Sequence, residues 1–201
     1  SVRRIMLDVI IALVPAMIGS IYFFGMNAVR LILITIISAV LFEAGTQKLF
    51  KKEIRIKDLS AIVTGILLAF NLPANAPWWL AIFGAGFAII IVKEFFGGIG
   101  SNFMNPALAA RAALVASWPG LMSTYINPDG MSTATPLAIL KSGSDALPSI
   151  QRMLIGDIGG SLGETSAILL LLGAAYLIVR KVIDWKTPII FIVTTTVLLL
   201  A

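Results

Sequence analysis

Two apolar runs near the N-terminus constrain this chain most strongly. Residues 5–24 and 28–50 give runs of 20 and 23 residues, and each contains a single acidic side chain, Asp8 in the first and Glu43 in the second. A helix needs about 20 mainly apolar residues to cross the hydrocarbon core of a bilayer. Both runs meet that length, so the sequence predicts an integral membrane protein that begins with two spanning helices.

The charge content agrees with that prediction. Only 12% of the 201 residues are charged, and 59% are hydrophobic, whereas soluble domains carry about 25% charged residues. The formal net charge is +5, but the basic residues flank apolar segments and form no stripe with interleaved aromatic rings. This pattern is typical of charges that set membrane topology, so we predict no nucleic-acid partner.

The chain contains no Cys and no His. Thiolate iron–sulfur sites, zinc sites and Cys or His nucleophiles are therefore excluded within it. We predict no metal site and assign no catalytic residue. Any redox chemistry must come from an organic cofactor or from partner subunits.

Shorter apolar segments follow the first two runs, and together they predict an all-α polytopic protein with about six transmembrane or broken half-helices. The later segments are residues 59–72, 78–96, 107–118, 164–179 and 188–201. Short segments interrupted by Gly and Pro resemble the discontinuous helices that line sites in transporters. A signal peptide is the competing interpretation of residues 5–24, but the run is long and no Ala-x-Ala site follows it. We expect a retained helix, with a kink at Pro15.

We expect residues 1–201 to form a single transmembrane domain that is incomplete at both ends. An N-terminus in the cytoplasm puts eleven Lys and Arg residues inside and three outside, with Arg111 at membrane depth. This excess satisfies the positive-inside rule. The same orientation places the loop of residues 119–148 on the outer face.

Five ionisable side chains lie within the apolar segments: Glu43, Glu94, Arg111, Asp157 and Glu164. Each would cost roughly 2.5 to 3.5 kcal/mol facing lipid. We therefore expect them to point inward and to pair, with Arg111 bound to one of the glutamates.

Several polar residues beside broken segments are candidates for an ion or flavin pathway. They are Asn71, Asn105, Arg111, Glu164 and Thr165. Asn105 and Arg111 fit two interpretations equally, a contact with a polar ligand at a helix N-terminus, or a structural cap and a buried pair. For Glu164 and Thr165, helix capping is favoured over oxygen ligation of a sodium ion. Residues 97–100 lack the spacing of a phosphate-binding loop and are interpreted as a flexible turn.

A hydroxyl-rich loop, Asp-Gly-Met-Ser-Thr-Ala-Thr-Pro, covers residues 129–136. Proline biases the residue before it toward extended backbone. Thr135 should therefore sit in an open segment with its hydroxyl available for covalent modification. Taken alone, such a loop is a weak signal.

Four stretches together resemble one family of membrane subunits. They are DLSAIVTGILLAFNLP at 58–73, GGIGSNFMNPALAAR at 97–111, DGMSTATPL at 129–137 and GGSLGETSA at 159–167. The family comprises the D subunit of the Rnf ferredoxin:NAD oxidoreductase and the B subunit of the Na⁺-translocating NADH:quinone reductase. It implies a ten-helix fold of two inverted repeats, similar to urea transporters.

The resemblance also implies a cofactor. FMN would be joined through a phosphoester to Thr135 by a flavin transferase on the outer face, with Asp129, Ser132 and Ala134 completing the transferase signal. Thr133 departs from the commoner pattern, which has Gly there. Non-covalent riboflavin is implied in some members.

The implied function is that of an electron-carrying subunit, not a complete enzyme, of an ion-translocating complex in the prokaryotic inner membrane. It would pass electrons across the membrane, coupled to Na⁺ or H⁺ transport. Its partners would be membrane lipid, membrane and peripheral subunits with flavin and iron–sulfur groups, and the transferase. The Rnf type is favoured over the quinone reductase because the first span begins almost at once. The alternatives are a small-solute transporter or channel of related fold without flavin, and a passive scaffold subunit.

Overall fold

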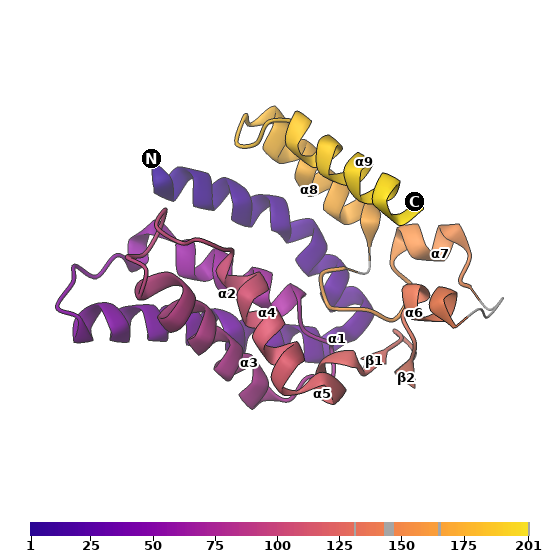
Figure 1. Ribbon diagram of the computed structural model, residues 1–201, viewed down its shortest axis with the longest axis horizontal. Helices are drawn as coiled ribbons and strands as arrows, with labels where there is room; N and C mark the ends of the chain where they lie inside the picture. The colour runs from indigo at the N-terminus through magenta and orange to yellow at the C-terminus, as the bar shows by residue number, and fades with distance from the viewer. Residues whose placement is uncertain (131, 143–146, 165, 201) are drawn as a thin grey trace.

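The computed structural model describes residues 1–130, 132–142, 147–164 and 166–200, and these are mostly helical. Helix α1 covers Val2–Leu49, with non-helical dihedrals at Gly25 (φ 57°, ψ −136°). Figure 1 shows the two halves of α1 running in opposite directions from this point. The predicted pair of helices is confirmed, but the expected kink at Pro15 is wrong as the point where the helix breaks. Glycine adopts a positive φ without steric cost, so the reversal falls at Gly25.

The next segments form a second group of helices. A short 3₁₀ turn at Ile56–Asp58 leads into α2 (Ser60–Phe70), which ends at Asn71. Helix α3 (Trp78–Gly86) continues directly into the π-helical segment η2 (Phe87–Glu94). After a turn in which Gly97, Gly98 and Gly100 all have positive φ, α4 covers Pro106–Ser117.

The remaining elements are short until the last two helices. They are α5 (Pro119–Ser123), β1 (Tyr125–Ile126), β2 (Ser132–Thr133), α6 (Pro136–Lys141), α7 (Ile150–Ile155), α8 (Ala167–Val179) and α9 (Lys186–Leu200). Strands β1 and β2 pair antiparallel, with Tyr125 opposite Thr133. In Figure 1 the two strands, α6 and α7 gather at the end of the molecule opposite the N-terminus.

The packing core lies where α1 contacts α2, α3 and α8. Small residues allow these helices to approach closely. A Cβ added at Gly173 in α8 would overlap the carbonyl oxygen of Ala12 in α1. Within the described residues, α1 is the one helix long and apolar enough to cross a membrane, and α2, α4, α8 and α9 are shorter apolar helices.

Candidate functional site

The chain breaks after α2 and before α8 lie against each other. Pro73 and Ser161 form an antiparallel bridge. The backbone N–H groups of Leu162 and Gly163 donate to the carbonyl oxygens of Leu72 and Phe70, both at 3.0 Å. Buried backbone groups need partners, and the two broken segments supply them to one another.

Glycine is required at this contact. A Cβ added at Gly163 would overlap the side chain of Phe70. Ser20 in α1 fastens the same segment, because its hydroxyl donates to the carbonyl oxygens of Leu162 at 2.5 Å and Ala16 at 2.8 Å. The junction therefore joins α1, α2 and the segment that precedes α8.

Arg111 of α4 points its guanidinium at this junction. Its Nη1 lies 3.0 Å from Glu164 Oε1, 3.2 Å from Ser161 Oγ, 3.1 Å from Asn71 Oδ1 and 3.3 Å from the Asn71 carbonyl oxygen. The prediction that Arg111 pairs with a glutamate is confirmed, and the partner is Glu164. One nitrogen carries two hydrogens, so these four acceptors share its donors.

Three predicted pathway residues, Asn71, Arg111 and Glu164, are thus brought together from segments far apart in the sequence. Ser161 completes the cluster and is fully buried. The sequence analysis missed its contact with Arg111 and the role of Ser20. The signal for Ser161 was its place in the glycine-rich stretch before Glu164.

The other two predicted pathway residues stand apart from this cluster. Asn105 is the N-cap of α4, and its Oδ1 accepts from the N–H groups of Ala107 at 3.0 Å and Leu108 at 3.2 Å. This bears out the capping interpretation. Thr165 lies outside the described residues.

The capping prediction for Glu164 is wrong. Helix α8 begins at Ala167 with Ser166 as its N-cap, and the Ser166 hydroxyl accepts from Leu169 N–H at 3.4 Å. The backbone of residues 161–163 is held against the break after α2. The helix therefore starts later than its apolar pattern indicates, and Glu164 is placed to pair with Arg111.

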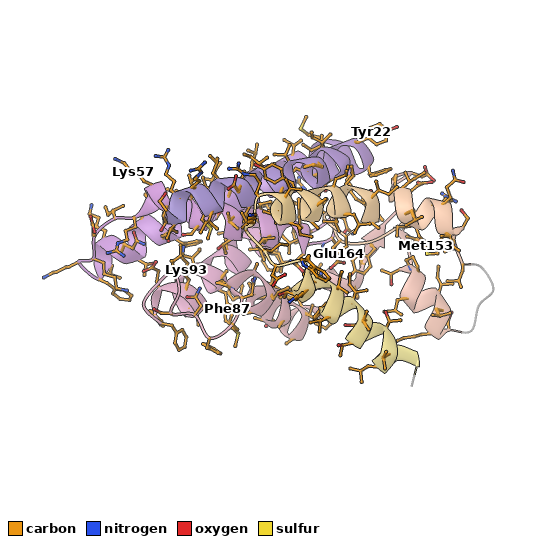
Figure 2. All side chains as sticks on the ribbon, turned by 90° about the horizontal axis from the view of Figure 1, so that it is seen from above. Tyr22, Lys57, Phe87, Lys93, Met153 and Glu164 are labelled. Carbon is orange, nitrogen blue, oxygen red and sulfur yellow. The ribbon has the colours of Figure 1, made fainter. Side chains whose placement is uncertain are left out.

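A second ionic cluster lies at η2, well separated from Glu164 along the long axis of the molecule (Figure 2). The buried Lys93 ammonium donates to Glu43 Oε1 and to Ser60 Oγ, both at 2.5 Å. Neighbouring Glu94 accepts from Gln47 Nε2 at 3.0 Å. Glu43 and Glu94 point inward as predicted, and both lie on the wall of a cavity of about 480 Å³.

Two ionisable residues behave differently from expectation. Lys93, counted among the basic residues that set topology, is only 2% exposed because it neutralises Glu43. Asp157, expected to point inward, instead pairs with Arg152 at 2.7 Å, and its side chain is 38% exposed. Its partner comes from the turn just before it, so it needs none from the interior.

The hydroxyl-rich loop lies at the end of the molecule that holds the two strands. Thr135 has extended backbone (φ −66°, ψ 154°), as predicted from the following proline, and is the N-cap of α6. Its Oγ1 accepts from Ala138 N–H at 3.3 Å. Asp129 and Ala134 are exposed, and Ser132 belongs to β2.

These features define a class of protein. Long and short apolar helices, two broken segments paired around an arginine, and buried ion pairs are those of a helical membrane protein. The chain belongs to the NQR2, RnfD, RnfE family, whose model matches residues 1–201.

Its relatives share one description. The chain is 52% identical over 203 residues to the D subunit of the Na(+)-translocating ferredoxin:NAD(+) oxidoreductase complex of Acetobacterium woodii, covering 98% of this chain and 64% of that protein. It is 41% identical over 214 residues to the D subunit of the proton-translocating ferredoxin:NAD(+) oxidoreductase complex of Clostridium ljungdahlii, with coverages of 98% and 64%. The D subunit of the ion-translocating oxidoreductase complex of Rhodobacter capsulatus is 38% identical over 224 residues, with coverages of 94% and 63%. The chain therefore spans somewhat less than two thirds of these relatives.

Proposed function

We propose that this chain is part of the D subunit of an Rnf-type, ion-translocating ferredoxin:NAD⁺ oxidoreductase and carries FMN as a phosphoester on Thr135. The observation that carries the proposal is the Thr135 loop in a chain of this family. Relatives that translocate Na⁺ and relatives that translocate protons are both similar to it. The coupling ion is therefore left as Na⁺ or H⁺.

The Thr135 hydroxyl fits a phosphoester. Among the described residues its oxygen accepts one hydrogen bond, from Ala138, and donates none. Replacing its hydrogen by phosphorus therefore breaks no bond within that part of the chain. The extended backbone before Pro136 keeps the side chain out of a helix. When bound, FMN would supply electron-transfer chemistry that a chain without Cys or His does not provide itself.

The Arg111 junction is the proposed route for an ion or a flavin through the protein. It combines one guanidinium, the Glu164 carboxylate, the Ser161 hydroxyl and the Asn71 amide at a break between helices. Irregular backbone of this kind is tolerated at membrane depth where it is buried or lines a cavity. Asn105 and Thr165 flank the same route in this proposal.

The wider arrangement is proposed on the same basis. The N-terminus would be cytoplasmic and Thr135 on the outer face of the inner membrane, within residues 119–148. This part would belong to a ten-helix, inverted-repeat fold of the whole subunit, which could also take a non-covalent riboflavin. Flavin and iron–sulfur subunits would be its partners, and a flavin transferase would act in maturation.

The test is covalent flavin on the full-length subunit co-expressed with its transferase. Fluorescence of the denatured band, with intact mass, should show one FMN on the wild-type chain and none on Thr135→Val. Thr124→Val is the matched control, because Thr124 is a loop threonine outside the motif. A Thr135→Val chain that keeps its flavin would sink the assignment.

The rival function is a small-solute transporter without flavin, for which the paired broken segments around Arg111 speak equally. The two differ at Thr135, since a transporter needs no covalent group there. A purified, colourless subunit that conducts a small solute in liposomes favours the rival. A flavin-loaded subunit that conducts none favours the redox function.

A further inference from the structure

A cavity of about 510 Å³ opens beside Thr135. We call it the loop cavity. Ala134 and Pro136, the neighbours of Thr135 on both sides, lie on its wall together with Asn127, Arg152, Asp157 and Gly159. A group attached to the Thr135 hydroxyl would therefore leave the chain at the edge of this cavity.

The far wall of the loop cavity is built by a close contact. A Cβ added at Gly159 would overlap Thr133 Cγ2 and would lie 3.4 Å from Asn127 Oδ1. The segment around Gly159 is thus pressed against the β1–β2 hairpin. This contact holds together two parts of the chain that are more than twenty residues apart and gives the cavity a fixed shape.

Arg152 is the charged side chain that the fold holds in place here. Its Nε and Nη2 lie 2.8 Å and 2.7 Å from Asp157 Oδ2. The turn at Gly156 (φ 106°) brings Asp157 back, and the Asp157 N–H donates to the Arg152 carbonyl oxygen at 3.1 Å. A guanidinium has five N–H donors. The two spent on Asp157 fix its plane and leave donors for another acceptor.

We infer that the loop cavity seats the isoalloxazine ring of the flavin and that Arg152, positioned by Asp157, stabilises the reduced ring. This rests on the proposed FMN at Thr135. Ligand cavities of about 300–1,000 Å³ hold small molecules of this size. The wall is apolar at Ile139, Leu147 and Pro148 and polar at Asn127 and Arg152, which matches a ring with a hydrocarbon edge and an edge of carbonyl and ring nitrogen acceptors.

The charge assigns a direction to the effect. Uptake of two electrons and one proton leaves the flavin ring with one negative charge. A cation beside that charge lowers the energy of the reduced form more than that of the oxidised form. Arg152 therefore raises the reduction potential of this flavin.

The test is a potentiometric titration of the full-length, flavin-loaded subunit, with dithionite as reductant. For Arg152→Gln the reduced-to-oxidised ratio at a fixed potential should fall at least tenfold, which is about 30 mV for a two-electron couple. Arg152→Lys should keep most of the wild-type potential. Arg55→Gln is the matched control, because Arg55 is 71% exposed and pairs with an acidic neighbour, Glu53, away from the cavity.

Covalent flavin is measured first on every variant. A wild-type chain without flavin at Thr135 ends the proposed function and this inference together. A fully loaded Arg152→Gln variant with the wild-type potential overturns the inference alone.

A second measurement needs no substitution. The covalent flavin of the wild-type subunit should be several-fold less accessible to iodide quenching than free FMN, because the ring lies in the cavity. Quenching as strong as that of free FMN would also overturn the inference.

Discussion

Arg111 Nη1 lies 3.0 Å from Glu164 Oε1, so an ion pair connects α4 to the segment that precedes α8. The Arg111 side chain is 27% exposed and that of Glu164 is 56% exposed. Exposed ion pairs contribute about 0–1 kcal/mol. The neutral acceptors around Arg111, buried Ser161 and Asn71, are therefore expected to matter more for stability than the charge of Glu164.

Arg111→Ala should destabilise the protein by about 1–3 kcal/mol, the cost of leaving a buried polar group without a partner. Glu164→Gln should cost less than about 1 kcal/mol, because its carboxylate remains solvated. Thermal unfolding of the full-length subunit in detergent measures both. Equal losses for the two variants would contradict this assignment of roles.

The same two variants separate the proposed pathway from a passive scaffold. In the complete complex in liposomes, Arg111→Ala and Glu164→Gln should lower ion transport while covalent flavin content stays at the wild-type level. Arg30→Gln, at the start of the second half of α1 and away from the junction, is the control for lost charge. Unchanged transport in both junction variants would favour the scaffold.

The Lys93–Glu43 pair should show strong coupling. Lys93 and Glu43 are 2% and 1% exposed, and removing one partner of a buried pair costs about 3–5 kcal/mol because the other charge is left unpaired. Lys93→Met and Glu43→Gln should each lower the unfolding temperature strongly, and the double variant should recover much of the loss. Strictly additive single effects in this double-mutant cycle would argue against a direct pair.

Gly173→Ala should destabilise the packing of α8 on α1. The added methyl would meet the carbonyl oxygen of Ala12, a backbone atom that cannot move aside by rotation, and overpacking typically costs about 1–3 kcal/mol. Gly45→Ala is the matched control within a helix, because a Cβ there would meet nothing within 4 Å. It should be neutral or stabilising by up to about 1 kcal/mol. A stable Gly173→Ala variant would show that the two helices separate readily.

Ser20→Ala should cost about 1 kcal/mol through the lost hydrogen bond to the Leu162 carbonyl oxygen. Ser123→Ala removes a comparable hydroxyl bond, to the Pro119 carbonyl oxygen, at an exposed position, and should have a smaller effect. Unfolding in detergent compares the two. If both variants unfold alike, Ser20 does not hold the junction.

The sequence alone predicted the features that are written locally. The reversal between residues 24 and 28, the cap at Asn105 and the extended backbone of Thr135 each follow from side chains within a few positions. Proline fixes its neighbours and glycine permits positive φ wherever the fold lies. The four flavin-signal residues, 129, 132, 134 and 135, are close because they are nearly consecutive.

Only the tertiary structure decided which distant groups meet. Apolar periodicity places Arg111, Glu164 and Lys93 in segments, but a partner across 53 or 50 positions depends on how the helices pack. That packing turned Lys93 from a surface charge into the counter-ion of Glu43, and it delayed the start of α8 so that Glu164 could reach Arg111. A buried charge is stable only where a partner lies within hydrogen-bond distance. That distance is a property of the assembled helices and not of any one segment.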